Sequence, residues 1–342
     1  MRVNIIGGGL AGCALAYVLK QAGAQPVIYE AGPRLASGAS GNEVGLYNPR
    51  FTAQLDAVGS FYSKAFFESL KVFEEFGDEI DWTPCGALHL MTNDQKKKRF
   101  PKTVESWNWS LEDMRLVNAQ EASSIAGIEI VYDALYLSRS GTVSPRKLCA
   151  RYARDVEVHL NHHIEDLSHL AEDVTILACG VGALGFEGAA HLPLKVVRGQ
   201  VSYAKPTEMS CDLNVTIGYG GYISPVKDGV HCIGSTFQRW LNHRELMPED
   251  DEENFKKAIQ NVPSLNGLNE KRASWAGLRT TSRDHFPVVG QLSENLYVST
   301  AHGSHGVLST LISAKILSKN IAVPQLDMSS VCVDALRPCR FN

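Results

Sequence analysis

A glycine-rich turn near the start of the chain restricts its fold more than any other feature. Residues 2–6 are apolar enough for a short buried strand, and a helical pattern over 10–21 begins beside the Gly-Gly-Gly-Leu-Ala-Gly turn at 7–12. A second strand is predicted over 26–30, and it ends at an acid, Glu30. This order of strand, Gly-x-Gly-x-x-Gly turn, helix and acid-terminated strand predicts a Rossmann-type dinucleotide site.

Each residue of this turn has a physical task in such a site. Gly7 permits the tight turn, Gly9 lets a pyrophosphate approach the backbone, and Gly12 lets helix and strand pack closely. The helix start at Leu10 and Ala11 supplies amide donors and a favourable dipole for phosphates. An ordinary cluster of turn glycines is the alternative, and the surrounding strand–helix–strand pattern disfavours it.

The acid at the second strand selects among dinucleotides. Glu30, followed by Ala31, is expected to accept hydrogen bonds from the adenosine ribose, which disfavours NADP. The motif alone does not choose between NAD and FAD. A site that starts at residue 5, with segments of the same domain returning near the end of the chain, favours FAD.

Composition excludes several classes of protein. The chain has 342 residues, is 44% hydrophobic and has a net charge of -4, so a strongly basic nucleic-acid binder is not indicated, although a local basic patch stays possible. Its eight cysteines contain no Cys-x-x-Cys pair, which favours reduced thiols. No signal peptide and no membrane span of ~18 apolar residues is expected, so the cytoplasm is the expected location.

Patterning predicts the remaining elements. Strands are expected at 85–91, 129–137 and 174–178 and repeatedly within 194–237, and helices at 54–76, 146–154, 250–259 and 307–318. Residues 32–49 are expected to be loop, and the last twenty residues an extended tail.

These pieces predict an α/β fold, α+β overall, in which a Rossmann-type nucleotide domain is assembled from separated segments. The expected nucleotide domain comprises 1–80, 136–192 and 283–325. A strand-rich substrate domain with a mixed sheet is expected over 81–135 and 193–282, and 326–342 form the tail.

Several separated motifs share one resemblance. They are the segments 36–49, 85–90, 140–145, 198–201, 233–237, 277–290, 302–308 and 336–341. Together they resemble the D-amino-acid oxidase (glycine oxidase, sarcosine oxidase) superfamily of FAD-dependent oxidoreductases. Within it, they are most similar to the oxidase half of the bifunctional tRNA 5-methylaminomethyl-2-thiouridine biosynthesis enzyme.

The resemblance implies FAD as cofactor and assigns residues to it. Those near FAD would be Ser37, Ser40, Gly41, Asn42, Gly45, Cys179, Gly180, Gly303, Ser304 and His305. The guanidinium of Arg279 would bind a substrate carboxylate, for which its fork is suited, although a structural pair with Asp284 is the alternative. Backbone amides of Gly306, Val307 and Leu308 would stabilise charge at flavin N1 and C2=O. No cysteine lies in the late signature around Arg279, so the FAD is expected to be non-covalent.

The implied reaction removes the carboxymethyl group of carboxymethylaminomethyl-uridine at the tRNA wobble position and releases glyoxylate. The alternatives are a small-molecule oxidase for glycine, sarcosine or a D-amino acid, and a flavin-binding subunit without turnover. The expected partners are tRNA or a small amino acid. Because the chain starts at the oxidase strand, any methylation is expected from a separate methyltransferase.

Other conspicuous residues receive weaker interpretations. His302 and His305 lack further ligands at metal spacing, so no metal site is expected. The run from Lys96 to Arg99 could steer RNA phosphates, but a solvated helix face is favoured. Trp82, Trp107 and Trp109 could stack on bases, although core or rim packing is equally favoured.

Overall fold

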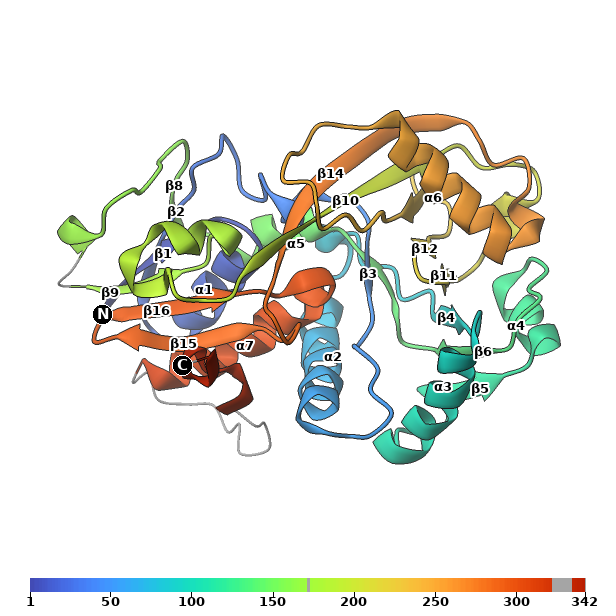
Figure 1. Cartoon of the computed structure of the whole chain (residues 1–342), viewed down its shortest axis with the longest axis horizontal. Helices are drawn as coiled ribbons and strands as arrows, with labels where there is room; N and C mark the ends of the chain where they lie inside the picture. The colour runs from blue at the N-terminus through green and yellow to red at the C-terminus, as the bar shows by residue number, and fades with distance from the viewer. Residues whose placement is uncertain (171–172, 322–333, 342) are drawn as a thin grey trace.

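The computed structural model describes residues 1–170, 173–321 and 334–341. A six-stranded sheet and an eight-stranded sheet lie side by side, with helices packed against both (Figure 1). A third sheet of two short strands lies between them (Figure 1). The predicted α/β fold with a strand-rich second part is confirmed.

The six-stranded sheet has the order β15-β16-β9-β1-β2-β8 and is parallel except for the β15–β16 pair. Its strands are β1 (Arg2–Ile6), β2 (Gln25–Tyr29), β8 (Glu157–His159), β9 (Val174–Leu177), β15 (Val288–Ser293) and β16 (Leu296–Thr300). The first strand of the chain is thus central, flanked by β2 and β9. The carboxyl ends of these strands form the edge at which ligands bind in open α/β sheets.

Four helices share one apolar core with this sheet. They are α1 (Leu10–Gln21), α2 (Ala57–Phe76), α5 (Pro145–Tyr152) and α7 (Gly306–Asn320). The bounds of α1 agree with the prediction. The helix predicted from residue 54 begins three residues later, because the Asp56 carboxylate accepts a hydrogen bond from the Gly59 amide and caps it there.

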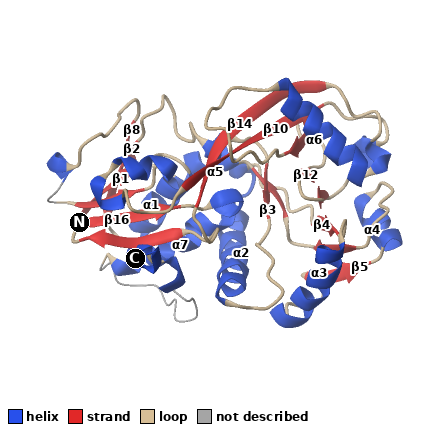
Figure 2. Ribbon diagram, viewed as in Figure 1, coloured by secondary structure: helices blue, strands red, loops and turns tan. Residues whose placement is uncertain are grey.

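The eight-stranded sheet has the order β14-β10-β13-β12-β11-β4-β6-β5 and is mixed. Its strands are β4 (Ala87–Leu90), β5 (Met114–Val117), β6 (Ala134–Leu137), β10 (Lys195–Ala204), β11 (Thr216–Gly218), β12 (Tyr222–Ile223), β13 (His231–Gly234) and β14 (Lys271–Thr281). Helix α6 (Pro248–Asn261) lies over β10, and α3 (Asp94–Trp107) and α4 (Ala119–Ala126) lie at the far end (Figure 2).

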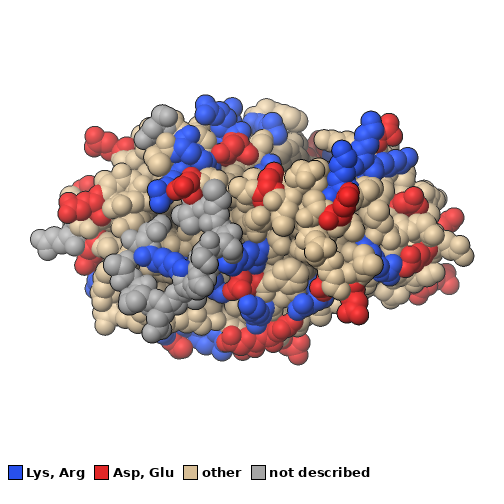
Figure 3. Space-filling view, turned by 90° about the horizontal axis from the view of Figure 1, so that it is seen from below, with Lys and Arg blue, Asp and Glu red and all other residues tan. Residues whose placement is uncertain are grey.

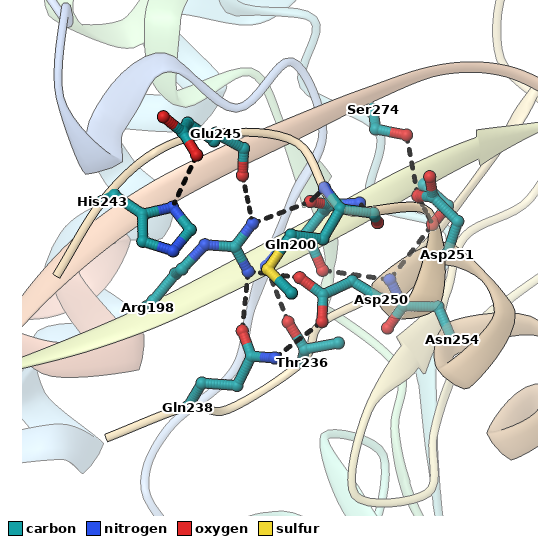
Figure 4. Close-up of polar contacts among 12 residues, drawn as sticks. Arg198, Gln200, Thr236, Gln238, His243, Glu245, Asp250, Asp251, Asn254 and Ser274 are labelled. Atoms are coloured by element: carbon teal, nitrogen blue, oxygen red, sulfur yellow. Dashed lines mark hydrogen bonds and ion pairs between the residues drawn. The ribbon is translucent and has the colours of Figure 1, made fainter. Parts of the chain in front are cut away.

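A buried polar network joins α6 to β10 (Figure 4). The Arg198 guanidinium, which is fully buried, forms an ion pair with Asp250 on α6. It also donates to the Gln238 and Gln200 side-chain carbonyls at 2.6 and 3.0 Å. The Asp251 carboxylate accepts from the Ser202 hydroxyl at 2.6 Å. The network therefore fixes α6 and the segment that follows β13 to one long strand.

Several elements differ from the prediction, and the strand predicted over 129–137 is formed only by β6 at 134–137. The segment 32–49 contains a short strand, β3 (Gly45–Tyr47), which pairs with β7 (Gly141–Val143). The strand β8 was not predicted, because it has only three residues. The extended tail is wrong for residues 334–341, which form two short 3-10 turns with Leu336 buried and Pro338 against Gly290. Its other residues, 323–333 and 342, lie outside the described part.

The membership of the two sheets supports the proposed domain division, which remains a proposal. One boundary needs adjustment, since the division at 135/136 cuts β6, a strand of the eight-stranded sheet. Within the described residues, no helix is long and apolar enough to cross a membrane. The seven cysteines in the same ranges are all free, in agreement with the expected thiols.

Candidate functional site

A cavity of about 920 Å³ collects the residues that the sequence singled out. Its walls come from both large sheets, from the turn between β1 and α1, from the loop before β3 and from the start of α7. Of the expected site residues, these line it: Gly7, Gly9, Leu10, Ala11, Glu30, Ala31, Ser40, Asn42, Gly45, Cys179, Gly180, Arg279, Gly303, Ser304, His305, Gly306 and Val307. Gly12, Ser37, Gly41 and Leu308 are not among its lining residues.

The turn between β1 and α1 has no space for side chains. Gly7 has a φ of +113°, and a Cβ there would lie 2.7 Å from the Ala178 carbonyl oxygen. A Cβ on Gly12 would lie 1.9 Å from the Gly7 carbonyl oxygen. The role predicted for Gly12, close packing of the turn on the helix, agrees with this contact although it does not face the cavity.

Glu30 fixes two turns at once. Its carboxylate oxygens accept hydrogen bonds from the Gly8 and Gly32 amides, both at 2.7 Å. The carboxylate therefore braces the turn while one side of it lines the cavity, where a ribose could meet it. Residue Ala36, which sequence analysis did not single out, has a φ of +57° and donates its amide to the Gly8 carbonyl at 2.9 Å.

The loop before β3 contributes both lining and support. Ser40 accepts a hydrogen bond from the Leu10 amide at 3.0 Å, so it already engages the start of α1. Asn42 accepts from the Tyr203 hydroxyl at 2.8 Å, which ties this loop to β10. Ser37 donates to the Arg34 carbonyl at 2.5 Å, and Gly41 packs against the Trp275 ring. These last two residues shape the loop from behind.

Arg279 lies on β14, and its guanidinium packs against the backbone of the neighbouring strand, where a glycine leaves room for it. A Cβ added to Gly199 of the neighbouring strand would lie 2.5 Å from both terminal nitrogens of Arg279. The guanidinium donates to the Ser235 hydroxyl at 2.5 Å, and among the described residues no carboxylate lies within ion-pair distance of it. The alternative partner, Asp284, is paired with Arg340. A half-buried cation that faces a cavity and has no acid beside it among the described residues is equipped to bind an anionic ligand.

The approach to α7 positions two neutral histidines. His302 contacts the Ser309 and Ser299 hydroxyls at 3.0 and 3.2 Å, and burial lowers its pKa to about 3. His305 contacts the Asn48 carbonyl at 3.1 Å, and burial lowers its pKa to about 4. Among the described residues, no group of three or more His, Cys, Asp or Glu could hold a metal ion. Both rings thus hold the loop in place.

The start of α7 faces the same cavity. Gly306 and Val307 line it, and the first-turn amides of any α-helix have no partner within the helix. They can therefore donate to an acceptor in the cavity. The side chain of Leu308 is buried in the core instead.

The carboxyl end of β9 forms the wall beside Glu30. Cys179 and Gly180 lie here, and Gly180 accepts a hydrogen bond from the Thr300 hydroxyl at 3.0 Å. Burial raises the pKa of the Cys179 thiol to about 11, so it remains protonated and acts as a small wall residue.

Sequence analysis did not bring together four residues that line the cavity: Arg50, His89, Lys96 and Arg99. The solvated face proposed for the run 96–99 is wrong for two of its members, because Lys96 and Arg99 turn inward while Lys97 and Lys98 are exposed. Their spacing of three residues, one helical turn, was the available signal.

The tryptophans pack inside the protein. The indole nitrogens of Trp82, Trp107 and Trp109 donate to Tyr47, Thr52 and Ser63 at 2.9, 3.1 and 2.9 Å. The Trp109 ring stacks on Phe66 with centroids 5.2 Å apart. Of the two interpretations, packing is the one that fits these contacts.

The site fits FAD by its donors and its shape. The glycine turn, the start of α1 and Glu30 line one part of the cavity. The start of α7 lines another part of it. Two helix N-termini and one acid in the cavity wall suit a diphosphate, an adenosine and a ring that becomes anionic on reduction. FAD would supply the two-electron redox chemistry that no side chain provides.

Comparison with known proteins agrees with this geometry. The family model described as FAD dependent oxidoreductase matches residues 2–320. A bifunctional protein of Idiomarina loihiensis named for tRNA 5-methylaminomethyl-2-thiouridine biosynthesis, MnmC, is 30% identical over 98% of this chain and 57% of its own length. Its counterpart in Methylobacillus flagellatus is 28% identical over 99% and 59%. The chain thus spans less than two thirds of these relatives.

Solved structures show the same fold. A glycine oxidase from Bacillus cereus has a TM-score of 0.79 at 21% identity, with 98% of each chain covered. An iminodiacetate oxidase from Chelativorans sp. BNC1 has a TM-score of 0.79 at 18% identity, covering 98% of this chain and 99% of its own. By its family match, its fold and its cavity, the chain belongs to the FAD dependent oxidoreductase family and is an enzyme that uses FAD.

Proposed function

We propose that this protein oxidises a secondary amine carried by tRNA. The substrate is carboxymethylaminomethyl-(2-thio)uridine at the wobble position, and the products are the aminomethyl-uridine and glyoxylate. The observation that carries the proposal is the guanidinium of Arg279, which lines the cavity and has no carboxylate partner in the described part of the chain. The names of the MnmC relatives supply the RNA context.

The chemistry divides between cofactor and protein. When bound non-covalently, FAD would supply the two-electron oxidation of the carbon between nitrogen and carboxylate, and hydrolysis of the imine by water would give the amine and glyoxylate. Arg279 binds the carboxylate of this N-substituted glycine through two parallel hydrogen bonds. Amides of Gly306 and Val307 stabilise negative charge at the ring. Oxygen serves as the final electron acceptor and leaves as hydrogen peroxide.

The neutral histidines fit this scheme. The amine must lose its own proton before oxidation, and no strong base is required of the protein. With pKa values near 3 and 4, His302 and His305 are uncharged at neutral pH, so they add no positive charge that would repel an ammonium substrate. The reaction would occur in the cytoplasm, and a separate methyltransferase remains a predicted partner.

The decisive experiment mixes FAD-saturated protein anaerobically with tRNA that carries the carboxymethylaminomethyl group, and with the same tRNA lacking it. Bleaching of the flavin by the modified tRNA alone, with glyoxylate and aminomethyl-uridine found by mass spectrometry, is the expected result. An unchanged nucleoside, under conditions in which another amine bleaches the flavin, would refute the proposal.

A small-molecule amine oxidase is the second candidate. An unpaired guanidinium binds the carboxylate of free glycine, sarcosine or a D-amino acid equally well, and the fold is shared with a glycine oxidase. Peroxide release with one of these at a catalytic efficiency above that for modified tRNA would favour it. A flavin that no amine bleaches would instead indicate a subunit without turnover.

A further inference from the structure

We propose that Arg50, Lys96 and Arg99 form a second anion subsite within the cavity, which binds a phosphate of the nucleotide substrate. The inference rests on the proposed function for the identity of its occupant. The subsite would favour a nucleotide over glycine or sarcosine, because only the nucleotide offers a second anionic group. The three residues come from two places: the segment between β3 and α2, and one face of α3.

None of the three cations is neutralised by an acid. Lys96 donates to the Leu90 carbonyl and the Thr92 hydroxyl, both at 3.1 Å, and Arg50 donates to the His285 carbonyl at 2.7 Å. The Arg99 Nε atom is buried without a hydrogen-bond partner. Within the described ranges, no Asp or Glu forms an ion pair with any of them. Their remaining donors are available to a ligand.

The positive charges of Arg50, Lys96 and Arg99 repel one another. Burial first, and then the nearby Arg99, lower the pKa of Lys96 to about 8. Burial and the charge of Arg50 likewise lower the pKa of Arg99. Like charges that are partly desolvated and close together are unfavourable unless an anion joins them. A bound phosphate would remove this repulsion.

The cavity offers no internal anion for this purpose. Among the described residues that line it, Glu30 is the only one with a carboxylate, and its oxygens already accept hydrogen bonds from the Gly8 and Gly32 amides. A further donor lines the same cavity, since His89 is 8% exposed and its Nε2 atom is buried without a partner. Together, two guanidinium groups, an ammonium and an imidazole offer more hydrogen-bond donors than one planar carboxylate can accept. The oxygens of a phosphate suit this set of donors better.

Aromatic side chains beside these cations favour a nucleotide. Phe51 and Phe100 are largely buried and line the cavity with their rings edge-on, 5.8 Å apart, and the Phe51 ring lies 5.0 Å from the His89 ring. Apolar ring surface next to a phosphate subsite is the arrangement with which proteins bind single-stranded nucleic acid. Lys and Arg side chains also gather over the region of α3 on the face seen from below (Figure 3).

The first test measures binding of inorganic phosphate to FAD-saturated protein by calorimetry. The variants are Arg99→Gln and Lys96→Gln, and the matched control is Lys97→Gln, which removes the same charge from the exposed face of the same helix. Each of the two test variants should weaken phosphate binding about tenfold, while the control retains it. Phosphate binding that is absent, or equal in all variants, would overturn the subsite.

The second test compares carboxymethylaminomethyl-uridine as nucleoside and as 3′- or 5′-monophosphate in anaerobic flavin bleaching. The monophosphate should have an apparent Kd about tenfold lower, and Arg99→Gln should abolish that preference. No preference, or an Arg99-dependent preference for iminodiacetate instead, would overturn the phosphate assignment. If phosphate binds through Arg99 while neither uridine form bleaches the flavin, the subsite stands and the proposed reaction fails.

Discussion

The contact between Arg279 and the backbone of Gly199 determines what can replace the arginine. The planar guanidinium fits closely against the backbone at Gly199, and a lysine would offer a single ammonium in place of a fork. We expect Arg279→Lys to lower kcat/KM for carboxylate-bearing amines on the order of 10²-fold while FAD stays bound. Steady-state kinetics with Arg283→Lys, an exposed neighbour, as control would check it. Unchanged kinetics would remove Arg279 from the site.

Lys96 makes a prediction about pH. Because burial and Arg99 hold its pKa at about 8, the ammonium is charged at neutral pH and loses its proton as the pH rises through 8. Affinity for an RNA phosphodiester, whose own charge is constant in this range, should therefore fall above pH 8. Lys96→Gln should flatten this profile and Lys97→Gln should keep it. The same profile in both variants would contradict the assignment.

Among individual residues, sequence analysis identified those that belong to contiguous motifs. It did not identify those whose role depends on tertiary packing. Arg279 and the glycines of the first turn could be identified from local patterns. The inward direction of Lys96 and Arg99 could not, because it is set by Phe100, Thr103 and Trp107, which bury the adjoining face of α3. Hydrophobic periodicity is weak there, since the helix is mostly polar and contains Pro101.

Among the elements, α6 depends on its polar attachment to β10. Removing the Asp250 carboxylate would leave the Arg198 guanidinium buried without its counter-ion. We expect Asp250→Ala to reduce the free energy of unfolding by about 3–5 kcal/mol. Denaturant titration is the measurement, with Glu253→Ala as control, because its exposed pair with Lys257 contributes little. A loss no larger than that of the control would show that the network adds no stability.

The existence of α6 could be predicted from the sequence, but its inward contacts could not. The helix was predicted over 250–259 from its pattern, and the structure extends it to 248–261. Its acidic first turn resembles ordinary helix capping. Only the tertiary structure shows that Asp250 and Asp251 point inward, to partners on a strand 52 and 49 residues away in the chain.

Across the whole molecule, the end of the described chain fastens the late signature loop. Arg340 pairs with Asp284 and donates to the Phe286 carbonyl at 3.0 Å. Burial disfavours the Asp284 carboxylate, but hydrogen bonds from Arg340 and Ser282 outweigh it and lower the pKa to about 2. The stabilisation is therefore present above the unfolded pKa near 4 and is lost as pH falls towards 2.

Arg340→Ala should thus lower the melting temperature at pH 6, and the difference from the unaltered protein should shrink as pH falls from 4 to 2. Thermal unfolding followed across this range checks the expectation. Arg337→Ala, which alters an exposed pair with Asp334, is the matched control. A difference that stays constant down to pH 2 would show that the ion pair is not its source.

The position of β1 in the middle of its sheet has a consequence for synthesis of the protein. Strand β1 pairs with β9 at 174–177, which is translated later, and β9 in turn pairs with β16 at 296–300. The sheet around the dinucleotide turn therefore cannot be completed until residue 300 has emerged from the ribosome. Cofactor capture is expected to follow the synthesis of β16, and nascent chains that end before it should depend on chaperones.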